Sequence, residues 1–340
     1  MTQLGVAFVG LDHWYAALDL APAVAESQLL RVVAVAHGDS AKARQVAHDC
    51  GAEVWSTDDR AALDRADVDI VVALYSSDQN VAICQEAAAL GKHIVSVKPM
   101  ALDLAGADAI VAAVRSAGVH FFPLECGRRV SVAGQRTKRW VDEGRIGRPL
   151  RYLQTLHSSL PIAWPGSQDT NTWWTDPARV PGGAWIDHAI YAVDMVRWLL
   201  GSEPALVQGV AERQRYPELA VEDFGIATFT LANGAIAVIE DTWTADRGYG
   251  FSRSEVVGSA GAIIDEPGAG GRVALRGDFG FDDWLSVGPP RDQRVTPIEH
   301  LAACIREECA PLATVEDGRA NLAACLAFYD AARAGASVQL

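Results

Sequence analysis

The sequence has no apolar run that approaches the roughly 20 residues of a membrane-spanning helix. Its first residues, Met1-Thr2-Gln3, lead directly into an apolar segment, without the basic region or the small-residue cleavage site of a secretory signal. These absences predict a cytoplasmic protein that has no membrane partner.

Basic residues are scarce as well. The chain of 340 residues carries 29 Lys and Arg against 43 Asp and Glu, which gives a formal net charge of −14. Binding to nucleic acid depends on clustered cations that meet phosphate, so this balance disfavours a nucleic-acid partner. The densest basic stretch, 136–148, is interpreted as a solvated helix face.

Cysteines are few, and their spacing shows neither a CxxC pair nor a Cys/His ligand pattern. The sequence therefore predicts no metal site. Buried free thiols in a reducing compartment explain the six residues better than disulfides or zinc do. Cys126, which follows a predicted strand, is expected to fill the core. The six are Cys50, Cys84, Cys126, Cys304, Cys309 and Cys325.

Residues 1–120 alternate short apolar runs with helix-prone segments. The expected strands are 6–9, 29–36, 68–75 and 91–97, and the expected helices are 16–25, 40–51, 79–90 and 103–117. These runs are apolar throughout, which is typical of parallel strands that helices cover on both faces. The pattern predicts an α/β domain built from βαβ units.

The pattern changes after about residue 125. The expected elements are helices at 131–143, 184–200, 296–309 and 318–334, a strand at 149–158, a Trp- and Pro-rich loop at 161–181 and several alternating segments. Asn233-Gly234 lies between two apolar runs, which is a strong hairpin signal. This part predicts an α+β domain with an open, mostly antiparallel sheet.

The stretch "VAFVGLDHWYAALDL" (6–20) resembles a dinucleotide-binding fingerprint that has lost glycines. Gly10 occupies the position of the tight turn, whereas Asp12 and Tyr15 stand at the second and third glycine positions. A carboxylate at Asp12 is unfavourable beside an anionic pyrophosphate. From this motif alone, a dinucleotide site and an ordinary strand–turn–helix both remain open.

Several further motifs occur in a characteristic order. They are "GKHIVSVKPMAL" (91–102), "PGGAWIDHAIYAVDMVRWLLG" (181–201), "DFGIATFTLANGAIAVIEDTW" (223–243), "VVGSAGAI" (256–263) and the final "EDGRANLAACLAFYDAARAGASVQL" (316–340). Together they resemble the glucose–fructose oxidoreductase / inositol dehydrogenase (Gfo/Idh/MocA) family. The resemblance implies a Rossmann nucleotide-binding domain, 1–123, and a substrate-binding and oligomerisation domain, 124–340, whose C-terminal helix can pack back on the first.

The resemblance also implies an activity and an assembly. Family members oxidise or reduce hydroxyls of sugars, cyclitols and related polyols with NAD or NADP, and many pair through the open sheet face. We therefore expect a nicotinamide-dependent oxidoreductase that forms a homodimer or homotetramer. Two alternatives stay open: a glycoside hydrolase or lyase that uses a tightly bound nicotinamide transiently, and a non-catalytic binding or regulatory homologue.

The candidate cofactor residues follow the strands of the first domain. They are Gly10, Leu11, Asp12, His13 and Trp14 at the fingerprint, His37 and Lys42 after the second strand, Ser76 and Ser77 after the third, and Lys98. His37 replaces the carboxylate that NAD users carry for the ribose hydroxyls. Because nearby Lys42 and Arg44 are further cations, this segment favours NADP over NAD.

The candidate catalytic residues are Lys98, Asp187 and Tyr191. Lys98 is the retained centre of the family's Glu-Lys-Pro motif, in which Val97 replaces the glutamate. Tyr191 aligns with the family's proton-transferring histidine and shares a helix face with Asp187 and Asp194. We expect Tyr191 to move the hydroxyl proton with the aid of the Lys98 ammonium, and Asp187 to position the substrate.

The remaining candidates would contact substrate. His188 borders the face that carries Tyr191, and His157 ends the strand before the Trp-rich loop. Trp173 represents a group of tryptophans, with Trp164, Trp174 and Trp185, whose flat rings suit stacking against a sugar but also suit a core. Asp194 is expected to anchor its helix.

Overall fold

The computed structural model describes residues 2–266, 272–277, 284–286 and 296–340. The chain divides into two compact units. The first contains 1–130, 178–180 and 295–319, and the second contains 131–177, 181–294 and 320–340. The division therefore differs from a single boundary after residue 123, because two later segments return to the first unit.

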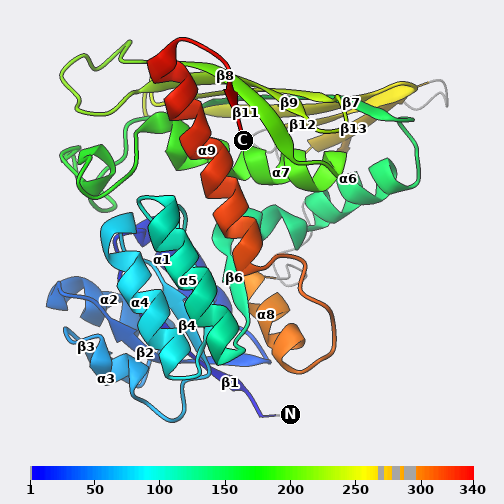
Figure 1. Ribbon diagram of the computed structural model, residues 1–340. Coiled ribbons are helices and arrows are strands. Elements are labelled where there is room, and N and C mark those ends of the chain that lie inside the picture. The colour runs from blue at the N-terminus through cyan, green and yellow to red at the C-terminus, as the bar shows by residue number, and fades with distance from the viewer. Residues whose placement is uncertain (1, 267–271, 278–283, 287–295) are drawn as a thin grey trace. The chain divides into compact units, whose positions relative to one another are not determined.

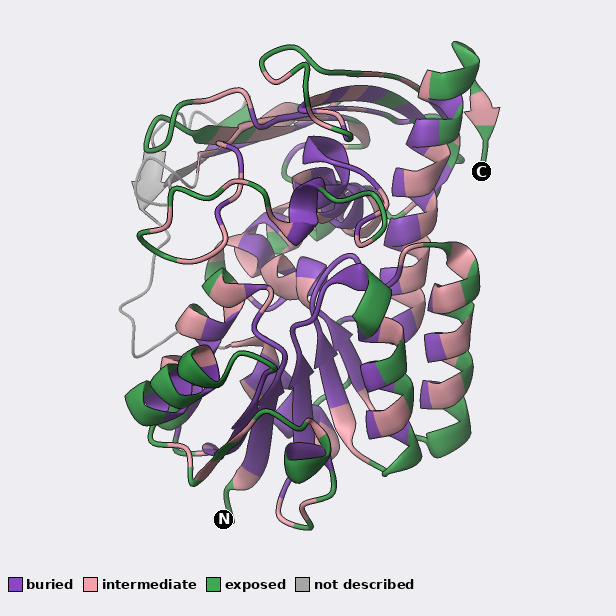
Figure 2. Cartoon of the chain, turned by 90° about the vertical axis from the view of Figure 1, so that its left-hand side faces the viewer, coloured by how far each residue is buried: buried purple, intermediate pink, exposed green. Residues whose placement is uncertain are grey.

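The first unit is built on a six-stranded parallel sheet in the order β3-β2-β1-β4-β5-β6 (Figure 1). The strands are β1 (Leu4–Val9), β2 (Leu30–Ala36), β3 (Val54–Ser56), β4 (Ile70–Ala73), β5 (His93–Ser96) and β6 (Phe121–Pro123). The central strands are buried along almost their whole length, as their colour in Figure 2 shows. The predicted α/β fold of this part is confirmed.

Helices flank this sheet. They are α1 (Trp14–Ala25), α2 (Ser40–Cys50), α3 (Arg60–Leu63), α4 (Ser77–Ala89) and α5 (Leu104–Ala117). Asp39 and Asp103 accept backbone N–H groups at the starts of α2 and α5, and Gly51 and Gly118 end the same helices in left-handed conformation. Sequence patterning missed β3 and α3, which are too short to show a period.

The first unit also holds a 3-10 helix (Leu124–Arg129) and α8 (Pro297–Ile305). A capping box between Thr296 and Glu299 starts α8. The Arg306 guanidinium donates to the carbonyls of Thr2 and Leu29, which fixes the end of α8 beside the first strands. These bonds explain why a late segment packs with the N-terminal sheet.

The second unit contains a nine-stranded sheet in the order β14-β13-β12-β11-β7-β10-β9-β8-β15. The strands are β7 (Pro149–His157), β8 (Pro204–Glu212), β9 (Phe224–Leu231), β10 (Ile236–Thr242), β11 (Phe251–Gly258), β12 (Gly261–Glu266), β13 (Arg272–Gly277), β14 (Trp284–Ser286) and β15 (Val338–Gln339). All neighbours run antiparallel except β10 and β7. The predicted open sheet and the hairpin at Asn233-Gly234 are confirmed.

Three α-helices belong wholly or partly to this unit: α6 (Val132–Asp142), α7 (Ile190–Leu200) and α9 (Val315–Ala334), whose residues from 320 on lie here. A π-helical turn (Trp185–Ala189) precedes α7, where the sequence predicted one regular helix. Trp185 stacks on Phe328 of α9, with ring centroids 4.0 Å apart, on one face of the sheet. No described helix is long and apolar enough to cross a membrane.

Candidate dinucleotide and catalytic sites

The fingerprint turn of the first unit requires a glycine at position 10. Gly10 has φ +80°, and a Cβ there would lie 2.7 Å from the ring of Tyr75. An L-residue would be strained in this conformation and would clash in this space. The one surviving fingerprint glycine therefore performs the role that the sequence assigned to it, which is the tight turn after β1.

Asp12, at the second glycine position, is neutralised by a neighbour that sequence reasoning missed. Its Oδ2 accepts the N–H of Ser76 at 3.0 Å and lies 3.2 Å from Nη2 of Arg179. Arg179 also donates to Ser76 Oγ at 2.6 Å. Arg179 stands 167 residues from Asp12 in the chain, so no local pattern could have indicated the pair.

Ser76 and Ser77 lie at the start of α4. Ser76 Oγ donates to Asp78 Oδ1 at 2.6 Å and makes no capping bond, so its side chain does not act as a helix cap. Ser77 is buried, and its Oγ has no hydrogen-bond partner within the described parts of the chain. A buried hydroxyl of this kind is costly unless a ligand or water satisfies it.

His37 is buried and holds the fingerprint turn instead of presenting a cation. Its Nδ1 accepts the N–H of Leu11 at 3.2 Å. Burial lowers the pKa of His37 below its ordinary value of 6.5, so the ring stays neutral at physiological pH. Lys42 Nζ lies 4.0 Å from Asp39, the cap of α2. Both observations weaken the argument for a 2′-phosphate.

The side chains at the other fingerprint positions differ in exposure. Leu11 and His13 are buried, whereas Tyr15, at the third glycine position, is 37% exposed. His13 Nδ1 and Tyr15 Oη are 3.0 Å apart. Trp14 begins α1 and meets the Tyr15 ring edge to face. Tyr15 therefore points outward, which lets α1 form without a glycine at its position.

Lys98 is 1% exposed and follows β5 by two residues. Asn80 of α4 fastens the chain on both sides of it, because its Nδ2 donates to Ser96 Oγ and to the Met100 carbonyl, each at 2.9 Å. Burial of an ammonium is costly without compensating contacts. The two hydrogen bonds of Asn80 thus fix the backbone on both sides of Lys98.

In the second unit, the carboxylates of Asp187 and Asp241 lie close to the imidazole of His188. His188 Nδ1 lies 3.3 Å from Asp187 Oδ2 and 3.6 Å from Asp241 Oδ1, and both carboxylates are buried. Trp243 Nε1 donates to Asp187 Oδ2 at 3.0 Å. Tyr191 lies beside His188, with ring centroids 6.5 Å apart. Asp241 lies on β10 and Trp243 directly follows that strand. Sequence analysis did not single out either residue.

A second carboxylate holds the start of this segment. Glu222 accepts the N–H groups of Gly183 and Trp185 at 2.9 and 3.1 Å and the hydroxyl of Tyr329 at 2.8 Å. Burial raises the pKa of Glu222 above its usual range. A Cβ at Gly182 would lie 1.9 Å from the Tyr329 hydroxyl, so the glycine permits this close packing.

The structure does not bring His157 to this cluster. His157 Nε2 bonds Glu240 at 2.8 Å. Side chains alternate along β10, so Glu240 and Asp241 point to opposite faces of the sheet. Asp241 faces the side on which Trp185 packs, and His157 therefore lies on the other side with Glu240.

The four tryptophans differ in burial. Trp173 and Trp174 are buried and stack on each other at 4.3 Å, and Trp185 lies in the core beneath the sheet. Trp164 is half-buried in the loop. Asp194 accepts a hydrogen bond from Asn321 of α9 at 3.1 Å, in agreement with the expected anchoring role.

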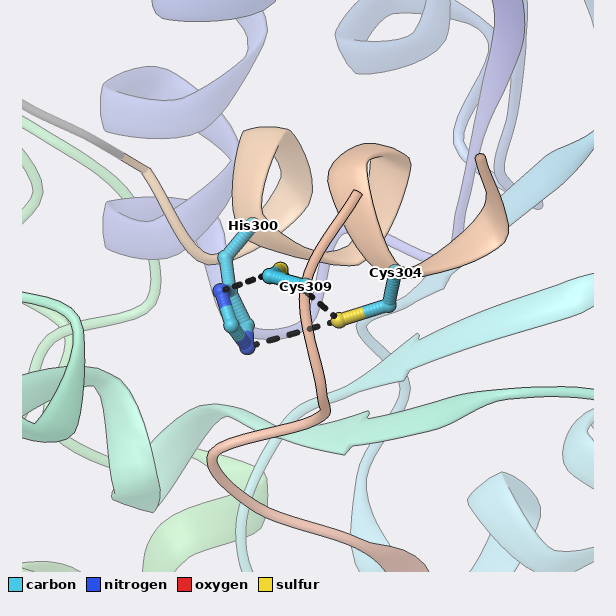
Figure 3. Close-up of side chains that lie close together, drawn as sticks. All are labelled: His300, Cys304 and Cys309. Atoms are coloured by element: carbon cyan, nitrogen blue, oxygen red, sulfur yellow. Dashed lines mark hydrogen bonds between the residues drawn. The ribbon is translucent and has the colours of Figure 1, made fainter. Parts of the chain in front are cut away.

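The cysteines depart from the prediction at one place. Five are buried free thiols, and Cys126 is in the core, but Cys309 is exposed. The structure also brings Cys304 and Cys309 to His300, as Figure 3 shows. Sequence analysis did not single out this group, whose spacing His-x-x-x-Cys-x-x-x-x-Cys spans a helix end and the turn that follows it.

Comparison with known proteins agrees with both halves of this description. Residues 4–124 match the family described as "Oxidoreductase family, NAD-binding Rossmann fold", and residues 135–264 match the "GFO/IDH/MocA C-terminal domain". An inositol 2-dehydrogenase of Saccharopolyspora erythraea is 30% identical, over 78% of this chain and 73% of its own. The NAD⁺-dependent scyllo-inositol 2-dehydrogenase of Bacillus subtilis is 28% identical, over 99% of this chain and 96% of its own.

A solved structure supports the same conclusion. The aldose-aldose oxidoreductase of Caulobacter crescentus, complexed with glycerol, is 25% identical, covers each chain fully and superposes with a TM-score of 0.85. The fold and the nucleotide-binding turn thus define a nicotinamide-dependent oxidoreductase. The chain belongs to the Gfo/Idh/MocA family, which confirms the resemblance found in its sequence.

Proposed function

We propose that the protein is an NAD-dependent dehydrogenase that interconverts a hydroxyl and a carbonyl group of a cyclitol or a closely related sugar. The observation that carries this proposal is the full-length similarity to the scyllo-inositol 2-dehydrogenase of Bacillus subtilis, together with a carboxylate–imidazole cluster on the π-helical turn before α7. Polar groups of this kind suit a polyhydroxylated substrate.

The residues of the first unit fit a dinucleotide. Gly10 provides the turn, and the buried Ser77 hydroxyl can form a hydrogen bond with the dinucleotide. The second fingerprint residue of such domains lies close to the pyrophosphate. Arg179 offsets the charge of Asp12 at that position and supplies a guanidinium that can bind phosphate. The neutral His37 ring favours NAD over the NADP that the sequence favoured.

The catalytic roles follow from the side chains present. When bound, the nicotinamide supplies the hydride acceptor or donor. In the second unit, Tyr191 transfers the proton of the substrate hydroxyl. In the first unit, the buried Lys98 ammonium contributes a positive charge to the nicotinamide site. Asp187, fixed by Trp243, orients His188, whose imidazole binds a further hydroxyl of the substrate.

The assembly is proposed from the open face of the second sheet. Val210, Ile236 and Phe251 point to this face and are between 40% and 49% exposed. A partly apolar, solvent-facing sheet favours association with a second copy. The free thiols suit a reducing compartment, and we accordingly propose the cytoplasm.

The test is turnover of a panel of inositols, aldoses and anhydro sugars with NAD⁺, followed by the absorbance of the reduced nicotinamide. We expect net reduction with at least one cyclitol, and its loss in Lys98→Met while the circular dichroism stays unchanged. Product formation without a net change in absorbance would instead assign a hydrolase or lyase. No thermal shift with any nicotinamide dinucleotide would refute the proposal.

A further inference from the structure

A second group of reactive side chains lies on α8 and the turn that follows it (Figure 3). Cys304 Sγ lies 3.5 Å from His300 Nε2 and 3.6 Å from Cys309 Sγ, and Cys309 Sγ lies 3.8 Å from His300 Nδ1. One donor atom from each residue can be chosen so that all lie within 4.8 Å of one another. The two sulfurs thus lie around the edge of one imidazole ring and close to each other.

The separations of Cys304 Sγ from Cys309 Sγ and from His300 Nε2 match two edges of a tetrahedral metal centre. With Zn–S near 2.3 Å and Zn–N near 2.0 Å, two sulfur ligands stand about 3.8 Å apart, and sulfur and nitrogen about 3.5 Å. The donor set, two thiols and an imidazole, is one that Zn²⁺ prefers over Mg²⁺ or Ca²⁺. The two sulfurs are too far apart for a disulfide bond.

The residues around His300 hold its imidazole in a fixed orientation. His300 is buried, and its ring meets the Phe122 ring edge to face at 5.8 Å. The Leu312 N–H donates to Nε2 at 3.1 Å, so the ring is unprotonated at that nitrogen. A metal at this nitrogen would replace the hydrogen bond from Leu312 with a stronger ligand bond. Cys309 is exposed, which leaves a path for the ion and room for a fourth ligand.

We propose that His300, Cys304 and Cys309 form a zinc site with water as the fourth ligand. The ion joins the end of α8 to the turn at Cys309. That turn contains Glu307 in left-handed conformation, which is unfavourable for a non-glycine residue and benefits from such a fastening. The role is structural, and it is independent of the dehydrogenase activity proposed above.

The test uses the full-length protein, reduced with a phosphine, stripped with a chelator and titrated with Co²⁺ alone. We expect one equivalent to bind with thiolate-to-cobalt charge-transfer absorption, and Zn²⁺ to displace it. Cys309→Ser, which alters an exposed side chain, should weaken Co²⁺ binding by roughly 100-fold or more. His300→Gln should do the same, whereas the matched control Cys50→Ala should bind as the wild type does.

Three results would overturn the proposal. One is the absence of Co²⁺ uptake by the reduced wild-type protein at micromolar concentration. Another is equal uptake by Cys309→Ser, which would place the ion elsewhere. The third is a Cys304–Cys309 disulfide in the purified protein whose reduction creates no metal affinity, since the pair would then be a redox couple. Circular dichroism and NAD binding establish that each variant is folded.

Discussion

At the scale of single residues, the most informative pair is Asp12 and Arg179. A carboxylate at the second fingerprint position would repel a pyrophosphate, but Arg179 offsets its charge and Ser76 donates to it. The site therefore keeps the electrostatic requirement of a dinucleotide-binding turn while losing the glycine that usually meets it. Such compensation explains how the altered fingerprint remains compatible with a cofactor.

This pair gives a direct prediction. Arg179→Gln should weaken NADH binding by roughly tenfold to a hundredfold, since a hydrogen bond to a charged group contributes about 1.5–3 kcal/mol. Isothermal calorimetry with NADH, ADP and adenosine would locate the effect, because adenosine carries no phosphate and should bind unchanged. Arg115→Gln, which removes another partly exposed arginine of the first unit, is the control. Equal NADH affinity in both variants would contradict the role of Arg179.

Tyr191 is the second residue whose role can be measured. Tyr191→Phe removes the hydroxyl without changing the ring, so kcat should fall by about 10²–10⁴-fold, the usual contribution of general acid–base catalysis, while cofactor affinity stays constant. Lys98→Met should also lower kcat, because it removes the buried ammonium that we propose takes part in catalysis. Steady-state kinetics of the two variants checks this.

His188 provides the alternative outcome. If Tyr191→Phe retains more than a third of the wild-type activity, the phenol is a packing group. His188, held between Asp187 and Asp241, is then the proton carrier. His188→Asn would in that case show the large loss of kcat, whereas our proposal expects mainly a higher KM.

At the scale of elements, the start of the segment that carries Asp187 and His188 depends on a carboxylate from elsewhere in the second unit. The first N–H groups of any helix lack partners within it. Glu222 and Tyr329 satisfy those of Gly183, Trp185 and Ile186. This support fixes the segment that carries Asp187 and His188 and compensates for its π-helical turn.

We expect Glu222→Gln to lower the free energy of unfolding by about 1–3 kcal/mol, because the new NH2 group can only donate, whereas the Gly183 N–H faces both carboxylate oxygens. The same variant should reduce kcat, since the turn that carries Asp187 loses its anchor. Thermal denaturation and steady-state kinetics measure the two effects. The exposed Glu218→Gln serves as control, and a Glu222 variant with unchanged melting temperature and kcat would show that the capping bonds contribute nothing.

At the scale of the whole molecule, the open face of the second sheet is the surface on which we base the proposed association with a second copy. Its central strands bury one face under α7, α9 and Trp185, and they leave Val210, Ile236 and Phe251 on the other. Isolated exposed apolar residues are common, and the proposal of a symmetric partner rests on the occurrence of several on this one solvent-facing side of the sheet.

The corresponding prediction concerns mass in solution. Light scattering coupled to gel filtration should show a dimer or tetramer for the wild-type protein. Phe251→Glu combined with Val210→Glu should shift it toward the monomer, because two charges would be buried unpaired at the interface. Leu90→Glu, on an exposed apolar residue of the first unit, should not. A monomeric wild-type protein would end the proposal.

The sequence by itself determined the fold class. The apolar runs of residues 1–120 and the Asn233-Gly234 turn act locally, through burial on both faces and through turn geometry, so their structures were predictable. The order of motifs along the chain also sufficed to identify the family. Gly10 could be assigned its turn because a positive φ is a property of a single residue.

Only the tertiary structure decided which distant groups meet. The pairs Asp12–Arg179 and His188–Asp241 join residues through loops and strand register that carry no short-range signal. The same applies to His37, whose burial makes it a neutral acceptor for Leu11 and not the cation that its position in the sequence indicated. Charge and protonation depend on the surroundings of a side chain, and the fold alone supplies those surroundings.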